Sequence, residues 1–388
     1  MSTVPSIQNP ETKIEACIIV GAGQAGLSLA YQLKQKKITP LIIDKEDRVG
    51  DVWRRRPDGM LLFTSRQFCQ LPGLALEGEP SGYPDKEEIA DYFEHYSKTL
   101  KLRVVNGVEV TSVRREKQIY EVTCSNGKVY QALSLVNATG ANQKTIIPDL
   151  SQHTSPDVLQ LTASDYRNVS SLQGNKNVAV IGDGASGRQI AAQLAEQHLD
   201  VTLFCGSKRA LVPNRILGKD LFWWLHHLGF LYADAGSLIG KILKKRNPIP
   251  VKSLNDRQLK KMGVRITSKL RSAHKNIVSD QQGENVSIDA IIWCVGYREV
   301  TDWLPLEGAR DKHGFCCESG IHKGGYTALP GMFLIGRKWL SSRSSELLAG
   351  MPKDSLRVAN FIERYLQQHP ALSRLELSAE YPVQEVMV

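Results

Sequence analysis

The stretch that decides the fold is Gly21-Ala22-Gly23-Gln24-Ala25-Gly26, which directly follows the apolar run EACIIV at 15–20. The β-branched run predicts a buried parallel strand, and Leu27, Ala30 and Leu33 after the glycines predict a helix. In a strand, G-x-G-x-x-G, helix unit, the first glycine permits a tight turn and the second lets the backbone approach a pyrophosphate. The third lets the helix pack closely on the strand. The stretch therefore predicts a dinucleotide-binding unit whose helix N-terminus faces the phosphates.

The same arrangement returns at Gly182-Asp183-Gly184-Ala185-Ser186-Gly187, after the run NVAVI at 177–181 and before a helical pattern that extends to Glu196. A single G-x-G-x-x-G is a weak signal because many turns are rich in glycine, but two copies in the same strand–helix context support each other. The sequence therefore predicts an α/β chain with two dinucleotide-binding, Rossmann-like domains, each built on a doubly wound parallel sheet.

The two copies differ where the second strand of each unit ends. Asp44 follows Gly21 by 23 residues, and a carboxylate there can accept hydrogen bonds from the ribose hydroxyls of an adenosine. The equivalent residue of the second copy is Cys205, and Ser207-Lys208-Arg209 follows it closely. Loss of the acid removes repulsion against a 2′-phosphate, for which Lys and Arg supply charge-assisted donors. We therefore expect FAD at the first site and NADPH, in preference to NADH, at the second; the alternative is that the two cations are solvated surface charges.

Length and composition agree with a soluble, multi-domain chain. The 388 residues, 42% hydrophobic and 23% charged, exclude a disordered chain, a collagen-like fibre and a small disulfide scaffold. The seven scattered cysteines contain no C-x-x-C pair, which is typical of a reducing compartment. The N-terminus lacks the apolar run of a signal peptide, and the most lipophilic stretch, 221–232, is too short to span a bilayer. We therefore expect a cytoplasmic protein.

The net charge of +9 is unevenly distributed along the chain. Residues 208–275 contain 16 Lys and Arg but only three Asp, which leaves the rest of the chain mildly acidic. Such a cationic, partly aromatic segment could dock on an anionic membrane or a protein partner, or form a lid over the active site. No recognised nucleic-acid motif accompanies it, so we expect no nucleic-acid partner.

With both fingerprints in place, the chain resembles the superfamily of FAD- and NADPH-dependent flavin monooxygenases, which includes flavin-containing monooxygenases and the plant YUCCA enzymes. The resemblance extends from about residue 14 to residue 362. Its carriers are the two fingerprints, Gly50-Asp51-Val52-Trp53, QFCQLPG at 67–73, Ala138-Thr139-Gly140, Trp293-Cys294-Val295-Gly296-Tyr297 and the strand 332–336.

The resemblance implies an NADPH domain, 174–289, inserted into an FAD domain made of 14–150 and 290–388. Together with the first fingerprint it implies the following FAD-binding residues: Gly21, Gly23, Gln24, Ala25, Gly26, Asp44, Gly50, Trp53, Val110, Gly140, Gly336 and Leu348. The NADPH-binding residues expected from the second copy are Gly182, Gly184, Ala185, Ser186, Gly187, Ser207, Lys208 and Arg209.

Two dinucleotides imply hydride transfer from NADPH to FAD, in which the protein positions the cofactors and tunes their electrostatics. The sequence contains no convincing acid–base triad. Arg337 and the N-terminus of the helical run 346–367 are candidates for stabilising reduced flavin. The catalytic residues are otherwise unassigned.

The favoured function is an FAD-dependent monooxygenase, in which a C4a-hydroperoxyflavin formed with molecular oxygen attacks a small lipophilic or nucleophilic N, S or carbonyl substrate. Two alternatives stay open: an NADPH:acceptor reductase that passes electrons to a quinone or protein, and a flavoprotein that senses redox state or NADPH. They stay open because the family signature F-x-G-x-x-x-H-x-x-x-Y retains only Tyr166, with Pro156, Val158 and Thr162 at its other positions.

One further cluster raises the question of a metal. His313, Cys316, Cys317 and His322 lie within ten residues and could in principle hold zinc. Adjacent cysteines in a glycine-rich loop are unlike a zinc clamp, so we expect no metal.

Overall fold

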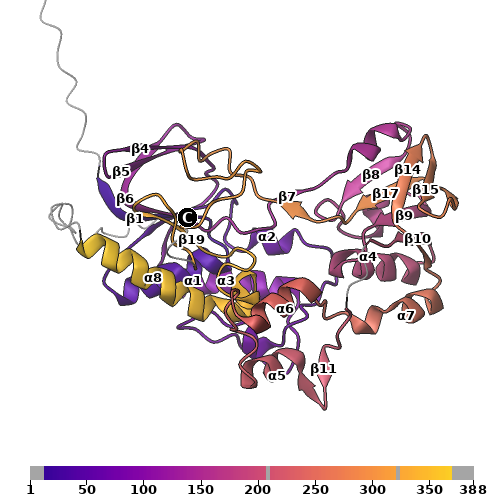
Figure 1. Cartoon of the computed structure of the whole chain (residues 1–388), viewed down its shortest axis with the longest axis horizontal. Helices are drawn as coiled ribbons and strands as arrows, with labels where there is room; N and C mark the ends of the chain where they lie inside the picture. Colours follow the sequence, from indigo (N-terminus) through magenta and orange to yellow (C-terminus); the bar gives the residue numbers. More distant parts are fainter. Residues whose placement is uncertain (1–12, 207–209, 320–323, 369–388) are drawn as a thin grey trace, which may run out of the picture.

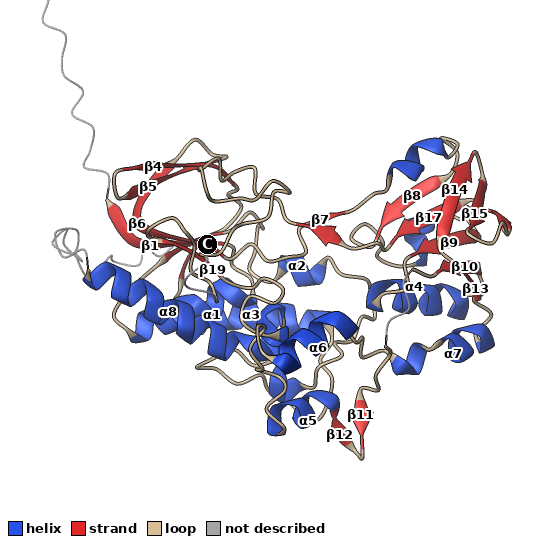
Figure 2. Ribbon diagram, viewed as in Figure 1, coloured by secondary structure: helices blue, strands red, loops and turns tan. Residues whose placement is uncertain are grey.

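The structure is a computed structural model that describes residues 13–206, 210–319 and 324–368. The described chain forms two lobes, each with a sheet and its own helices (Figures 1 and 2). The sheet of the first lobe has the strand order β3-β2-β1-β6-β5-β4, with β19 also pairing with β6. Its strands are β1 (Ile14–Val20), β2 (Leu41–Ile43), β3 (Arg103–Val105), β4 (Val110–Glu116), β5 (Ile119–Cys124), β6 (Val129–Asn137) and β19 (Met332–Leu334). The first sheet is mixed, because β4, β5 and β6 pair antiparallel while its other strands pair parallel, so the fully parallel sheet expected there is found only in the second lobe.

Helices cover one face of this sheet, and strands with a loop cover the other. Fully buried Cys17 and Ile19 of β1 face a core shared with the helices, whereas Ile18 faces a second core formed with β4, β5 and the loop around Leu304. This alternation follows from the two-residue period of a strand and explains why the run at 15–20 is apolar throughout. The helices of this lobe are α1 (Gln24–Gln35), α2 (Asp51–Arg54), α3 (Lys86–Thr99) and α8 (Met351–Gln367).

The sheet of the second lobe is parallel, with the order β13-β10-β9-β17-β8. Strand β9 lies in the middle of the order and leads into α4, which is the doubly wound arrangement expected around a dinucleotide fingerprint. The elements are β8 (Leu159–Thr162), β9 (Asn177–Ile181), α4 (Ala185–Glu196), β10 (Asp200–Phe204), α7 (Asp256–Lys261), β13 (Arg265–Thr267) and β17 (Ala290–Trp293). An antiparallel meander of β14 (Leu270–His274), β15 (Ile277–Asp280) and β16 (Asn285–Ser287) joins β13 to β17.

The pairing of β8 and β17 differs from the predicted domain boundaries. Both strands belong to the second sheet, although β8 precedes residue 174 and β17 follows residue 289. Divided by its sheets, the chain enters the second lobe before Leu159 and leaves it after Trp293. The predicted boundaries fall inside the second lobe because strands as short as β8 and β17 carry no signal of which sheet they join.

The two lobes are joined by a pair of crossing segments. Strand β7 (Lys144–Thr145) pairs antiparallel with β18 (Tyr297–Arg298), and the Ile146 amide donates to the Gly296 carbonyl at 3.0 Å. Figure 1 shows β7 between the lobes. The two segments that connect the lobes therefore lie side by side at residues 144–146 and 296–298.

A segment of the second lobe, residues 211–250, crosses back to the first. It contains the hairpin β11 (Arg215–Ile216) and β12 (Lys219–Asp220), then α5 (Leu221–His227) and α6 (Leu238–Arg246). Asp234 forms an isolated bridge with Ser342, and the Tyr232 hydroxyl donates to the Ala349 carbonyl at 3.1 Å. We call residues 211–250 the crossover segment.

Candidate functional site

The first fingerprint has the geometry of a dinucleotide loop at each of its three glycines. Gly21 has φ +108°, and a Cβ on it would lie 2.7 Å from the Ala138 carbonyl oxygen. A Cβ on Gly26 would lie 1.9 Å from the Gly21 carbonyl oxygen, so α1 can pack on this loop only through a glycine. Gly23 has no atom within 4 Å of the corresponding point. The open space at Gly23 is where a pyrophosphate would meet the N-terminus of α1.

Asp44, predicted to hold a ribose, lies directly over this loop. Its carboxylate accepts hydrogen bonds from the Ala22 amide and, at 2.8 Å, from the Glu46 amide. Burial raises the pKa of Asp44, and the hydrogen bond from Ala22 opposes that shift. The segment that leads to Val110 is adjacent, since the Val108 amide donates to the Asp44 carbonyl at 3.0 Å. Asp44 and the approach to β4 thus form one side of the first site.

The C-terminal part of the chain completes this site. Gly336, after β19, is so close to α1 that a Cβ on it would lie 2.8 Å from the Ala25 Cβ. The Gln24 side-chain amide donates to the Glu346 carbonyl at 3.0 Å, and Leu348 follows, 5% exposed. The structure therefore brings Ala25 close to Gly336, and Gln24 close to the 346–348 stretch that contains Leu348.

Helix α8 begins at Met351, preceded by two short 3-10 turns, rather than at residue 346. Its first turn contains Asp354, which is 3% exposed, accepts from the Ser341 hydroxyl at 2.5 Å and faces Arg357 at 3.6 Å. A carboxylate at this place partly neutralises the positive end of the helix dipole. The stabilisation of reduced flavin that we expected from this helix is weakened accordingly.

The remaining residues expected at FAD lie on the same lobe. Gly50 has φ +95° and precedes α2, and a Cβ on it would meet the Ala90 carbonyl oxygen at 2.5 Å. Trp53 of α2 packs edge-on against Phe93 with ring centroids 6.4 Å apart. Gly140, φ +78°, lies in the first crossing between the lobes.

The second fingerprint reproduces the glycine geometry of the first. Gly182 also has φ +108°, and a Cβ on it would lie 2.5 Å from the Cys294 carbonyl oxygen. A Cβ on Gly187 would lie 1.8 Å from the Gly182 carbonyl oxygen, while Gly184 has no atom within 4 Å. Ala185 and Ser186 form the first turn of α4. The residues at both fingerprints therefore fit a dinucleotide, because each loop leaves open space only at its middle glycine.

Sequence reasoning missed a carboxylate at the second site. Asp183, inside the fingerprint, accepts from the Gly206 amide at 3.0 Å, just beyond Cys205. Arg188 of α4, 4% exposed, contacts the Asp183 carboxylate at 3.4 Å and that of Asp256 at 2.8 Å. An acid inside the fingerprint was the available signal. The expected 2′-phosphate clamp, Ser207-Lys208-Arg209, lies outside the described residues.

Arg337, the weak catalytic candidate, is held in a network of its own. Its Nε contacts the Glu299 carboxylate at 2.7 Å, and its Nη1 donates to the Cys316 carbonyl at 2.6 Å. The side chain is 14% exposed. An arginine already paired with a buried carboxylate contributes less net charge to a neighbouring flavin than a free one would.

The crossover segment covers the first lobe with an apolar cluster. Phe222, Leu231 and Ala349 are buried, and the rings of Phe63 and Phe222 stack with centroids 6.1 Å apart. Side chains packed around them are Phe68, Leu221, Leu225, Tyr232 and Leu347. This cluster lies beside the 346–350 stretch that contacts Gln24. The segment thus buries apolar side chains beside the first site.

All seven cysteines are free thiols. Burial raises the pKa of Cys17, Cys205 and Cys294 to about 12. Among the described residues no group of three or more side chains could hold a metal, and His322 of the suspected cluster lies outside them. In the same part of the chain no helix has both the length and the apolar character needed to cross a membrane.

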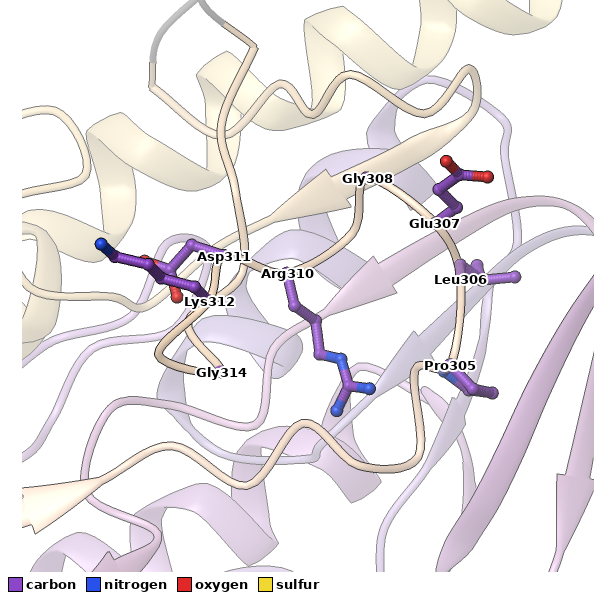
Figure 3. A pocket seen from close by; sticks show the side chains of 8 residues that line it. All are labelled: Pro305, Leu306, Glu307, Gly308, Arg310, Asp311, Lys312 and Gly314. Atoms are coloured by element: carbon purple, nitrogen blue, oxygen red, sulfur yellow. The ribbon is translucent and has the colours of Figure 1, made fainter.

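A hollow of about 550 Å³ opens in the loop between β18 and β19 (Figure 3). Its lining residues are Pro305, Leu306, Glu307, Gly308, Arg310, Asp311, Lys312 and Gly314. None of them belongs to a fingerprint, and Arg310 is already paired with Asp302 at 3.1 Å. The hollow therefore supplies no group to the nucleotide sites.

Comparison with known proteins agrees with this geometry. The sequence profile of the pyridine nucleotide-disulphide oxidoreductase family matches residues 18–214. An uncharacterized CzcO-like oxidoreductase of Geobacillus kaustophilus is 37% identical over 346 residues, covering 89% of this chain and 97% of the relative. A probable indole-3-pyruvate monooxygenase of Arabidopsis thaliana, YUCCA9, is 26% identical over 353 residues, covering 80% and 84%. Among solved structures, a flavin-containing monooxygenase from Stenotrophomonas maltophilia has a TM-score of 0.75 at 21% identity, covering 90% and 98%.

Proposed function

Because the chain belongs to the pyridine nucleotide-disulphide oxidoreductase family and to the flavin monooxygenase superfamily that uses FAD and NADPH, we propose that it catalyses an NADPH-dependent monooxygenation. The chain is an oxidoreductase whose cofactors are FAD and NADPH. Its substrate would be a small lipophilic or nucleophilic molecule that offers nitrogen, sulfur or a carbonyl group. The bound cofactors supply hydride transfer and the chemistry of molecular oxygen.

The observation that carries the proposal is the apolar cover over the first site. An oxygen-transfer reaction needs a site from which water is excluded, since water promotes loss of the activated oxygen as peroxide. Phe63, Phe222 and Leu231 provide such a cover directly beside the 346–350 stretch. A reductase that delivers electrons to a large partner needs the opposite, an accessible flavin edge.

The chain's own groups bind and orient the cofactors. The open backbone at Gly23 and Gly184 would receive the two pyrophosphates at the N-termini of α1 and α4. Asp44 would accept the ribose hydroxyls of FAD, for which it is already placed over the loop. The β7–β18 crossing joins the two sites and would fix the distance between the nicotinamide and the flavin.

The thiols argue against disulfide reduction. A disulfide reductase uses a thiolate with a lowered pKa near the flavin. Here burial raises the pKa of Cys17 to about 12 and raises that of Cys69 as well. Reduction of a quinone or a protein partner, or a sensory role without turnover, does not require such a thiol, so these remain the alternatives to test.

The test is the coupling of NADPH oxidation to oxygen. NADPH-reduced protein is mixed with oxygenated buffer in a stopped-flow instrument, and hydrogen peroxide is measured with and without candidate substrates. We expect an absorbance transient distinct from oxidised and reduced FAD, and less than one peroxide per NADPH when a substrate is present. One peroxide per NADPH with every substrate, together with rapid anaerobic transfer to a quinone, would establish the reductase instead.

A further inference from the structure

The crossover segment has an outer surface that nothing in the described chain covers. While its inner side packs on the first lobe, several of its large aliphatic side chains point into solvent, with exposed fractions up to 87%. We call this surface the docking patch. It consists of the exposed aliphatic residues Leu217, Leu228, Leu238, Ile239 and Ile242, together with the exposed cations of the same segment, Arg215, Lys219, Lys241, Lys244, Lys245 and Arg246.

Helix α6 packs on the protein through its glycine face, although an amphipathic helix is expected to pack through its aliphatic face. Gly240 is its buried residue, and a Cβ there would lie 2.1 Å from the Asp234 carbonyl oxygen. At about 100° per residue, Leu238 and Ile242 lie on the side opposite Gly240, and Ile239 lies on the flank of the helix. They are 79%, 42% and 54% exposed. An amphipathic helix normally buries such a stripe, so its exposure indicates that a partner outside the described residues receives it.

The tip of the β11–β12 hairpin gives an independent indication. Leu217 is 87% exposed and has φ +48°, and Gly218 after it has φ +76°. A two-residue turn with both φ values positive favours Asn-Gly or Gly-Gly, because a branched side chain is strained in this region. A leucine at this position contributes nothing to the core and costs conformational energy. A strained residue of this kind is expected where its side chain contacts a partner outside the fold.

The charge of the crossover segment indicates which kind of partner these aliphatic side chains contact. Residues 215–246 contain six Lys and Arg against Asp220 and Asp234, and Asp220 is buried. A second copy of the chain would bring this positive charge against itself. Trp223 and Trp224 are already engaged with neighbouring side chains: Trp223 stacks on His227 and lies under Lys219, and Trp224 packs edge-to-face with Trp223. This leaves less ring surface for stacking a nucleic-acid base. An anionic lipid surface matches both the aliphatic and the cationic groups.

We propose that the docking patch binds the protein to an anionic lipid bilayer. The aliphatic side chains of α6 and the hairpin tip enter the interfacial region, and the neighbouring Lys and Arg contact the lipid phosphates. The attachment is peripheral. It is independent of the proposed monooxygenation, because lipid binding is measured without turnover.

The experiment is co-sedimentation of the FAD-loaded full chain with phosphatidylcholine vesicles, with and without phosphatidylglycerol. We expect binding to the phosphatidylglycerol vesicles at low salt and weaker binding at high salt, as screening requires. Lys241→Glu combined with Lys245→Glu should weaken binding by about 25-fold or more, at roughly fivefold per lost cation. Leu238→Glu combined with Ile242→Glu should abolish it.

The control is Ile147→Glu, which places one glutamate at a 52% exposed aliphatic residue outside the crossover segment. It should bind like the wild type, and every variant should retain FAD. Equal binding to neutral and anionic vesicles would overturn the proposal, as would unchanged binding by either double variant. It would also be overturned if the wild type sediments as a dimer without vesicles and Leu238→Glu with Ile242→Glu dissolves that dimer.

Discussion

The two nucleotide modules, the strand–glycine loop–helix units around residues 21–26 and 182–187, have the same backbone geometry. They differ in where the carboxylate beside the glycine loop comes from. In the first, Asp44 projects from the strand end onto the Ala22 amide of the glycine loop. In the second, Asp183 projects from the glycine loop onto the Gly206 amide after the strand end. The glycine contacts of the two loops agree closely, with Cβ clashes of 1.9 Å and 1.8 Å at the third glycine. Backbone geometry is therefore what a fingerprint requires, whereas the side chains that choose the nucleotide can come from either side of it.

The largest effect is expected from the third glycine of each module. Gly26→Ala should yield protein that lacks FAD and is destabilised by about 3 kcal/mol or more, because a backbone oxygen occupies the place of the new methyl group. Gly187→Ala should retain FAD but lose NADPH-driven reduction. FAD absorbance of the purified proteins and thermal unfolding test this. Loss of FAD in both variants would show that the two modules do not bind their cofactors independently.

Substitution of the middle glycine should weaken cofactor binding without affecting folding. Gly23→Ala and Gly184→Ala place a methyl group in open space, and both glycines have φ values near −70° that any residue can adopt. Their stability should change by no more than about 1 kcal/mol. Gly23→Ala should weaken FAD binding, and Gly184→Ala should weaken NADPH binding, each by roughly 10- to 100-fold, equivalent to about 1.4–2.8 kcal/mol. We expect titration calorimetry to show this weaker binding while the unfolding curves stay unchanged. Unfolding of either variant would contradict the prediction.

A smaller effect is expected at Asp183, where the modules differ. A carboxylate beside Gly206 repels a 2′-phosphate, although its contact with Arg188 reduces that repulsion. Asp183→Asn should raise the ratio of kcat/KM for NADPH to that for NADH by about 5- to 10-fold, or roughly 1 kcal/mol. Asp256→Asn, which changes the other carboxylate on Arg188, is the matched control and should leave the ratio nearly unchanged. A ratio that falls in Asp183→Asn would show that this residue does not act by repulsion.

The smallest effect is the pH dependence of FAD binding. Ionised Asp44 is the form that accepts ribose hydroxyls, and burial raises its pKa above the ordinary value of 3.8. FAD affinity should therefore be complete above the raised pKa and be lost as the pH falls through it. The loss should begin at a higher pH than for an ordinary aspartate. Asp44→Asn should bind more weakly and show a flatter pH profile; an unchanged profile would remove Asp44 from the site.

The sequence predicted the parts of this comparison that depend on local pattern. Two strand–glycine–helix units and the residue at each strand end can be read from the period of apolar residues and the spacing of glycines. The contact between Asp183 and Gly206 could not, because it depends on how β9 and β10 align side by side. The membership of β17 in the second sheet was missed for the same reason.

The crossover segment shows a second limit of pattern reasoning. Its composition indicated a lipophilic, cationic region, but composition does not say which side of a helix faces the protein. The buried Gly240 of α6 decides that, and its role is visible only in the contact with Asp234. The sequence thus predicted the charge of this region without predicting its exposed aliphatic stripe.

The central claim is that the second module delivers a hydride to the FAD held by the first. The most direct measurement is the anaerobic bleaching of the FAD absorbance near 450 nm after mixing with NADPH, in the wild type and in Gly187→Ala. We predict rapid bleaching in the wild type and at least about 100-fold slower bleaching in the variant at limiting NADPH, equivalent to about 2.7 kcal/mol. A wild-type flavin that stays oxidised with NADPH, yet is reduced by dithionite, would contradict the account.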